Sequence, residues 1–213
     1  FGANAIALDN NNYAILSTLV DNDTILNAGS VVLVDGTTGS TIGTPIRGDS
    51  ANDNIGQSGL ALANNNFVVA SRNDDVDGIS DAGSVMLING TTGALIGTPL
   101  SGDDANDRLG TTSLTALIGS NNFVVTTITD DNGAAVDAGS AMLVDGATGA
   151  IIGTPFRGNL DNDRIGNRGA FALNNGNYVV VSSEKNLGSF LDVGGVNLFN
   201  GTTGASIGLG VDG

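Results

Sequence analysis

The sequence predicts an all-β protein made of tandem four-stranded antiparallel blades, an arrangement like that of a β-propeller. Three observations lead to this prediction: a unit of about 54 residues occurs four times, apolar segments are short and separated by Gly and Asn turns, and glycine is abundant at 33 residues. Such a period is typical of propellers and solenoids, whose units share hydrophobic cores. We therefore expect function to come from a repeated surface before a unique pocket.

Two short motifs mark the repeat. Ala28-Gly29-Ser30 returns at residues 82 and 138 and, as Val193-Gly194-Gly195, at residue 193, with spacings of 54, 56 and 55 residues. The turn motif that begins with Asp35-Gly36 returns at residues 89, 145 and 200. We therefore expect a single repeat domain over 1–213, whose four blades either close on themselves or belong to a larger array. Its units are repeat 1 (1–54), repeat 2 (55–108), repeat 3 (109–164) and repeat 4 (165–213).

Repeat 2 illustrates the expected strands, which lie at Ser58–Ala63, Phe67–Ser71, Ser84–Ile88 and Ala94–Gly97. Asn and Gly tolerate positive φ, so the Asn-rich and Asn-Gly segments between these strands are expected to be tight turns. The second and third strands are apolar at nearly every position, which predicts burial on both faces. The three prolines are expected just after the fourth strands, where a missing N–H does no harm: Pro45, Pro99 and Pro155.

Repeat 4 departs from the other three. Asn197 stands where repeats 1 to 3 have an apolar residue, and Gly208-Leu209 replaces the Thr-Pro pair. Terminal repeats often have a more polar face because nothing stacks on them. These changes favour the end of an array.

The composition disfavours several classes of function. The chain has no Cys, His or Trp, so thiol nucleophiles, imidazole bases and the Ser/His/Asp triad are excluded. A net charge of −15 argues against binding to nucleic acid or to anionic membranes. No apolar run approaches the ~20 residues that span a bilayer. The chain shows no signal peptide and begins with Phe1, so we expect a processed or excised segment.

The repeat boundaries carry a family resemblance. Phe1-Gly2, Ile55-Gly56, Leu109-Gly110 and Ile165-Gly166 stand there, the last three after an Asn-Asp pair, and each repeat has an Ala-Gly-Ser-Val type of third strand. Across the whole chain this pattern resembles the FG-GAP repeat of integrin-alpha-type β-propellers, and more closely the shortened repeats of large bacterial surface proteins. The resemblance implies propeller blades on an extracellular or cell-surface protein. The FG-GAP calcium loop is replaced by short Asn turns, so that site is not carried over.

A different loop is our candidate metal site. The loop between the second and third strands repeats oxygen ligands at short spacing, which suits Ca²⁺ with its about six to eight oxygen ligands. The alternative is that these side chains form Asx-turns in a polar loop. The candidate ligands are Asp21, Asp23, Asn27, Asp75, Asp77, Asp81, Asp131 and Asp137, with Asn186 and Asp192 at the equivalent positions of repeat 4.

Two further sets of charged residues recur between repeats. Asp53, Asp107 and Asp163 are expected to accept hydrogen bonds from backbone amides at the repeat junction, rather than act as a glycosidase acid and base, because catalysis needs one asymmetric pocket. Arg47 and Arg157 occupy matching positions. We expect them to bridge blades, and contact with an anionic glycan is the alternative.

These observations favour a non-enzymatic extracellular or cell-surface protein, structural or adhesive, that self-associates into a filament or matrix or binds other surface proteins or glycans. A Ca²⁺-dependent module that binds a glycan or a protein is the alternative. A hydrolase or lyase that acts on polysaccharide ranks third, because the chain has no His and no unique carboxylate cluster. We expect no nucleic-acid partner and no membrane insertion.

Overall fold

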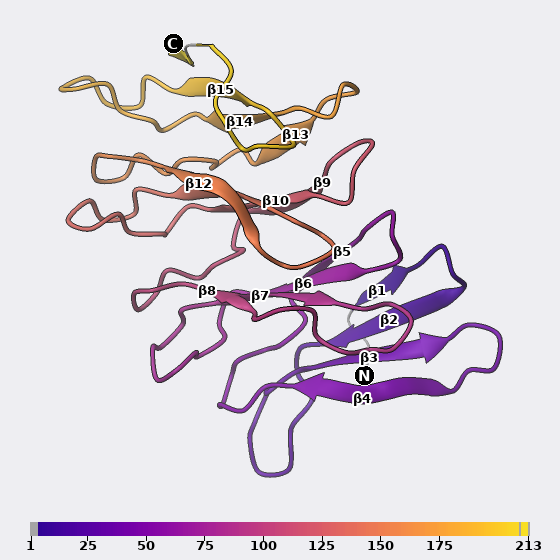
Figure 1. Ribbon diagram of the computed structural model, residues 1–213. Helices are drawn as coiled ribbons and strands as arrows, with labels where there is room; N and C mark the ends of the chain where they lie inside the picture. Colours follow the sequence, from indigo (N-terminus) through magenta and orange to yellow (C-terminus); the bar gives the residue numbers. More distant parts are fainter. Residues whose placement is uncertain (1–3, 209, 213) are drawn as a thin grey trace. The chain divides into compact units, whose positions relative to one another are not determined.

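The computed structural model describes residues 4–208 and 210–212 (Figure 1). Two features of the sequence analysis, the Phe1-Gly2 boundary marker and Leu209, lie outside the described residues. The described part of the chain contains sixteen β-strands and no helix, and therefore no helix that could cross a membrane.

The strands follow one another with tight turns. In repeats 1 and 2 they are β1 (Asn4–Ala7), β2 (Asn12–Ser17), β3 (Ser30–Asp35), β4 (Thr41–Arg47), β5 (Ser58–Ala61), β6 (Phe67–Ser71), β7 (Ser84–Ile88) and β8 (Leu100–Ser101). In repeats 3 and 4 they are β9 (Ser113–Ala116), β10 (Phe123–Thr127), β11 (Ser140–Val144), β12 (Ile151–Arg157), β13 (Ala170–Ala172), β14 (Tyr178–Ser182), β15 (Gly195–Phe199) and β16 (Val211–Asp212).

Each repeat forms its own sheet. The strand orders are β1-β2-β3-β4, β5-β6-β7-β8, β9-β10-β11-β12 and β13-β14-β15-β16, and all the pairs of neighbouring strands are antiparallel. The predicted fold class, tandem four-stranded antiparallel blades, is therefore confirmed.

The fourth strands differ from the prediction. In repeat 2 the expected strand at Ala94–Gly97 is reduced to a single bridge between Ile88 and Leu95, and β8 lies further along the chain. In repeats 1 and 3 the fourth strand continues through its proline, so Pro45 and Pro155 lie inside β4 and β12 instead of after them. Both strands are at a sheet edge, and a register shift next to the proline removes the need for its N–H.

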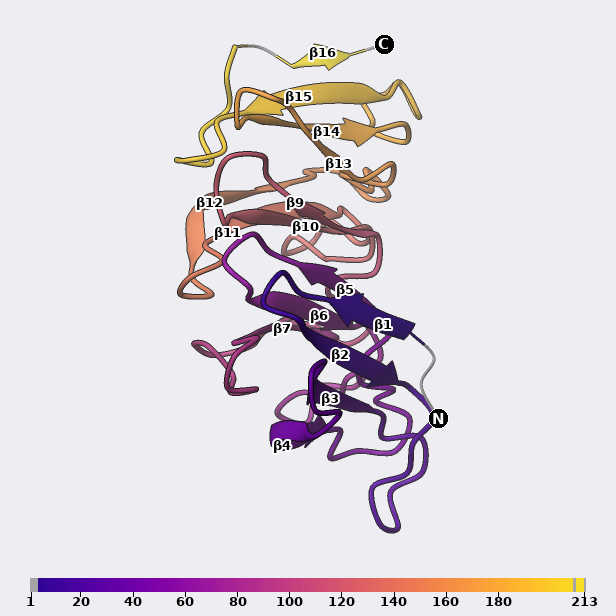
Figure 2. The same cartoon turned by 90° about the vertical axis from the view of Figure 1, so that its right-hand side faces the viewer.

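Two compact units make up the chain. Unit 1 contains Phe1–Arg108 with the turn Gly146–Gly149, and unit 2 contains Leu109–Asp145 and Ala150–Gly213. Each unit thus holds two four-stranded sheets. In unit 1 β1 lies beside β5, which Figure 2 shows at the edges of the first two sheets.

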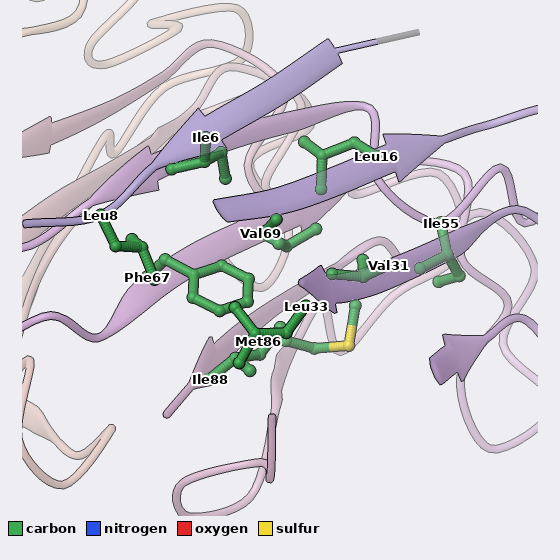
Figure 3. Close-up of a cluster of buried hydrophobic side chains, with 11 residues drawn as sticks. Ile6, Leu8, Leu16, Val31, Leu33, Ile55, Phe67, Val69, Met86 and Ile88 are labelled. Carbon is green, nitrogen blue, oxygen red and sulfur yellow. The ribbon is translucent and has the colours of Figure 1, made fainter. Parts of the chain in front are cut away.

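The two faces of each sheet are named after repeat 2. Face A carries Phe67, Val69 and Met86, while face B carries the alternating residues, such as Val68 and Val85. Face A of repeat 2 packs on face B of repeat 1, where Leu16 and Val31 point toward it (Figure 3). In unit 2 the same faces meet: Val124, Ala141 and Leu143 of repeat 3 contact Tyr178, Val180 and Phe199 of repeat 4.

Burial on both faces holds for the second and third strands of repeats 2 and 3. Every residue of β6, β7, β10 and β11 is buried. In β2 and β14 the face A and face B residues differ, because only one face has a neighbouring sheet: Ala14 is buried while Ile15 is partly exposed, and Val180 is buried while Val181 is partly exposed. The expectation of two buried faces is therefore wrong for repeat 1. For repeat 4 the sequence predicted an unstacked, more polar face at Asn197, but Asn197 is buried on face A and the partly exposed face B is apolar.

Candidate functional site at the repeat junction

The predicted ligands lie in the loops between the second and third strands, residues 18–29, 72–83, 128–139 and 183–194, which we call the junction loops. An equivalent hydrogen bond closes each of the four junction loops. Asp21 Oδ1 accepts it from the amide of Asn27 at 2.8 Å, and Asp75 Oδ1 accepts it from Asp81 at 2.7 Å. Asp131 with Asp137 and Asn186 with Asp192 repeat the bond at 2.8 and 3.0 Å. The first residue of each pair therefore clamps its loop.

The other predicted ligands shape the backbone. Asn27, Asp81, Asp137 and Asp192 all have φ between 50° and 52°. Asp23 and Asp77, at the tips of the loops of repeats 1 and 2, have φ of 55° and 54°. Asn and Asp occupy this left-handed region more readily than other side chains with a Cβ. Loop closure and backbone conformation thus account for the recurrence of Asp and Asn, and Ca²⁺ binding here stays a prediction.

The linker carboxylates hold the junction together. Asp53 is fully buried, and its Oδ2 accepts hydrogen bonds from the amides of Asp49 and Ser50 at 2.9 and 2.7 Å. Its Oδ1 accepts a third from Asp75 in the next repeat, at 3.2 Å. Asp107 and Asp163 are also buried and bind the corresponding linker amides. The predicted role of these three residues in binding backbone amides is confirmed.

Burial raises the pKa of Asp53, and the three backbone hydrogen bonds act in the opposite direction. The hydrogen bonds from these amides thus stabilise the charged carboxylate in a buried position that disfavours its charge. This arrangement is typical of a structural hydrogen-bond acceptor, because both oxygens already accept hydrogen bonds and the side chain is buried.

One cleft in unit 1 brings several acids together. It has a volume of about 320 Å³, and its lining includes Asp49, Asp74, Asp75 and Asp77 together with Arg47. Two of the predicted Ca²⁺ ligands, Asp75 and Asp77, thus share this cleft with two acids that were not predicted. The junction loop of repeat 2 thus contributes three acidic side chains to this cleft, Asp74, Asp75 and Asp77.

Asp74 is the most perturbed acid of the cleft. Its pKa is raised to about 6, mainly by burial and also by the negative charges of Asp53, Asp49 and Asp75. Asp130 is the equivalent residue of repeat 3, and Nη1 of Arg157 lies 3.1 Å from both of its carboxylate oxygens. Repeat 2 has Ser101 where repeat 3 has Arg157. The acid of repeat 2 therefore lacks the cation that neutralises its counterpart.

The matching arginines do not bridge blades. Nη1 of Arg47 donates to the carbonyl of Asp21 at 3.4 Å, and Nη1 of Arg157 donates to that of Asp131 at 2.8 Å. Both contacts stay within one repeat and tie the fourth strand to the junction loop, so the predicted bridge is wrong. A different arginine bridges two repeats: Arg164, the last residue of repeat 3, forms an ion pair with Glu184 of repeat 4 at 2.9 Å.

Sequence reasoning missed a second junction, at the Asn turns. The side-chain amides of Asn10 and Asn12 both donate to the Gly90 carbonyl of the next repeat, at 3.0 and 2.8 Å. Asn64 and Asn66 bind Gly146 in the same way, and Asn122 binds Gly201. A signal existed in the sequence, because the last position of the turn is Asn in all four repeats and the first is Asn or Ser.

Three carboxylates come within 4.8 Å of one another at only one place among the described residues, at Asp103, Asp104 and Asp107. Asp107 there accepts the amide hydrogen bonds of the other two residues, and both of these are exposed. Repeats 1 and 3 have Ser50 and Leu160 in place of Asp104. The group is thus an acidic variant of the linker turn.

Together these features define the class of the protein, an all-β tandem-repeat protein whose recurring polar residues join one repeat to the next. The chain belongs to a family described as a repeat of unknown function (DUF5650), whose model matches it four times, at residues 7–57, 61–111, 117–154 and 172–208. No curated protein matches the chain.

Proposed function

We propose that this chain is a non-enzymatic structural or adhesive repeat protein of the cell surface or extracellular space. One observation carries the proposal: the polar residues that recur in every repeat bind the backbone of the junction. Asp75 closes its loop and Asp53 holds three amides, and their counterparts make the corresponding bonds in the other repeats. Such residues rigidify an array and leave its outer surface for display.

The proposed location rests on the sequence. A Cys-free, strongly acidic chain of glycine-rich β-repeats suits an extracellular array, and the FG-GAP-like boundary residues favour the same location. We propose that the DUF5650 repeats of this chain are shortened relatives of FG-GAP blades. Its partners in this role are further surface proteins or glycans.

A Ca²⁺-dependent binding module is the second candidate, and the acidic cleft favours it. Asp75 and Asp77 line that cleft with Asp49 and Asp74, and mutual repulsion contributes to the raised pKa of Asp74. A divalent cation would relieve this repulsion. The polysaccharide-acting enzyme remains the least favoured hypothesis.

Thermal melting in millimolar Ca²⁺ and in chelator separates the two candidates, because a cation bound only by the folded chain must raise its melting temperature. The structural role predicts equal melting temperatures in both buffers. It also predicts that Asp75→Asn melts like the wild type, since Asn186 makes the same loop bond in repeat 4, and that Asp75→Ala loses about 1 kcal/mol.

A Ca²⁺ site predicts the opposite pattern. The wild type would melt higher in Ca²⁺, and both Asp75→Asn and Asp77→Asn would remove most of that increase. Asp9→Asn, a change at an exposed carboxylate outside the junction loops, is the matched control. An increase that Asp75→Asn abolishes and Asp9→Asn leaves intact would overturn the purely structural role.

A further inference from the structure

Repeat 4 leaves an apolar sheet face uncovered. Its face B carries Val179, Val181, Val196 and Leu198, with Phe171 and Val211 on the flanking strands. The equivalent residues of repeat 1 show what a covered face B looks like: Ile6 is 7% exposed where Phe171 is 52% exposed, and Val31 is 3% exposed where Val196 is 41% exposed. Repeat 4 therefore has the same apolar surface without the neighbour.

Repeat 1 leaves the complementary face uncovered. Its face A carries Tyr13, Ile15 and Val32, which are partly exposed, and Val34, which is buried. The equivalents of the first three in repeat 2, Phe67, Val69 and Met86, are 0%, 0% and 5% exposed because face B of repeat 1 covers them. In both units the structure pairs a face B with a face A. The open face of repeat 4 is a face B, and that of repeat 1 is a face A.

The Asn turns show the same complementarity. Asn10 and Asn12, Asn64 and Asn66, and Asn122 alone donate to a glycine carbonyl of the following repeat. Within the described residues, the side-chain amides of Asn175 and Asn177 in repeat 4 make no such bond. No described side chain donates to the carbonyl of Gly36, the equivalent glycine of repeat 1. A donor pair is thus open in repeat 4 and its acceptor is open in repeat 1.

Gly39 of repeat 1 and Gly208 of repeat 4 are a third pair of complementary positions. A Cβ on Gly93 would lie 2.8 Å from the carbonyl oxygen of Ile42, and one on Gly204 would lie 2.7 Å from that of Ile152, because the turn of one repeat rests on the fourth strand of the repeat before it. Gly39 is the equivalent glycine of repeat 1, and a Cβ there meets nothing within 4 Å. Gly208, which follows Ile207 in repeat 4, is equally open.

We propose that a second copy of this chain docks face A of its repeat 1 onto face B of repeat 4, so that chains associate head to tail. The interface reproduces the one between neighbouring repeats: valines of repeat 4 cover Tyr13, Ile15 and Val32, the Asn175 and Asn177 amides reach Gly36, and Gly39 rests on the Ile207 carbonyl. This contact is heterologous, so it can continue from copy to copy. The inference rests on the proposed structural role and names a second copy of the chain as the partner in that role.

Sedimentation velocity over a wide range of protein concentration tests the proposal. The wild type is expected to form a concentration-dependent series of oligomers, which added salt favours because it screens the repulsion between chains of charge −15. Val196→Glu blocks face B of repeat 4, and Val32→Glu blocks face A of repeat 1. Each variant alone should bind itself at least about tenfold more weakly, since an unpaired charge is buried in the contact.

Mixing these two variants gives the sharpest result. Val196→Glu keeps an intact face A and Val32→Glu keeps an intact face B, so an equimolar mixture should form a dimer with one copy of each and no larger species. The matched control is Val136→Glu, because Val136 is 53% exposed in a junction loop and belongs to neither face. This control should associate like the wild type.

A further variant tests the same contact without the risk that a buried Glu unfolds the chain. Gly39→Asn adds a side chain where the free chain has open space, at a φ of 72° that Asn tolerates, but it would collide with a docked copy. It should melt like the wild type and lose association, and it replaces Val32→Glu in the mixture if that variant unfolds.

Three results would overturn the inference. A wild type that stays monomeric at every concentration would exclude docking of a second copy, because the two faces would then be covered in another way, such as by each other within one chain. Association that survives Val32→Glu and Gly39→Asn but not Val196→Glu would indicate a symmetric contact between two repeat 4 faces. A mixture that stays monomeric would exclude the complementary pairing. None of these results bears on the Ca²⁺ melting experiment, so a failure here is distinct from a failure of the structural role.

Discussion

Phe67 and Tyr13 occupy the same position of the repeat but different environments. Phe67 is fully buried in face A of repeat 2, whereas Tyr13, in face A of repeat 1, remains partly exposed. The two side chains are similar in size and lie in equivalent strands. Their difference in burial therefore comes from the neighbouring sheet, which repeat 2 has on this face and repeat 1 lacks. Stability in this chain is a property of pairs of repeats, as expected for a repeat protein.

Alanine substitution at these two positions tests that comparison with the largest expected effect. Phe67→Ala should lower the free energy of unfolding by about 3–5 kcal/mol, because it leaves a cavity in the core that repeats 1 and 2 share. Tyr13→Ala should cost about 1 kcal/mol or less, since its ring is not enclosed. Urea unfolding, followed by circular dichroism at a concentration where the chain is monomeric, measures both. Equal losses would contradict the view that the neighbouring repeat supplies the burial.

A smaller loss is expected from the buried junction. Asp53→Ala removes the acceptor of three backbone amides, two in its own linker and one in the loop of the next repeat. Unpaired amides in a buried site are unfavourable, so we expect a loss of about 2–4 kcal/mol. Asp53→Asn keeps one carbonyl oxygen and removes a charge that burial disfavours, and should lose about half as much. The same urea experiment measures both variants, and an Asn variant no more stable than the Ala variant would argue against this role.

The main outline of the fold could be predicted from the sequence. The spacing of the Ala-Gly-Ser motif indicates four units, and the Asn turns with the Asp-Gly or Asn-Gly turns locate the hairpins in each. The edge strands could not be placed as well, because their pattern is weak. β4 and β12 continue through a proline, and repeat 2 has only a bridge at Leu95 where a strand was expected, with β8 further along the chain. An edge strand needs only one partner, so its sequence is less constrained.

The candidate site was harder to predict than the fold. The sequence shows that Asp and Asn recur in the junction loops, but a loop clamp and a metal ligand use the same residue types at the same spacing. The bond from Asp81 to Asp75 and the left-handed backbone at Asp77 become visible only in three dimensions. The same is true of the Asn10 and Asn12 clamp, whose acceptor lies about 80 residues away.

The comparison between Asp74 and Asp130 gives the smallest predicted effect and the most specific one. Asp74 has a pKa raised to about 6, above the value of 3.8 that applies to the unfolded chain. Its ionisation therefore lowers the free energy of unfolding. This destabilisation is absent below pH 3.8, grows between pH 3.8 and 6, and is complete above pH 6. Asp74→Asn should increase the free energy of unfolding by about 1–2 kcal/mol at pH 7.5, after allowance for solvent screening. At pH 4 the increase should nearly vanish.

Exchanging the arginine between repeats tests the cause of that shift. Ser101→Arg places in repeat 2 the cation that Arg157 supplies in repeat 3, so it should lower the pKa of Asp74 and stabilise the chain at neutral pH. Arg157→Ser should do the reverse, raising the pKa of Asp130, which is 2% exposed, and destabilising repeat 3 near neutral pH. Carboxyl carbon NMR titration follows both residues, and urea unfolding at pH 4.5 and 7.5 gives the linked stabilities. If the Asp74 titration does not move in the Ser101→Arg variant, the missing arginine is not what separates the two repeats, and burial alone must account for the perturbed acid of the cleft.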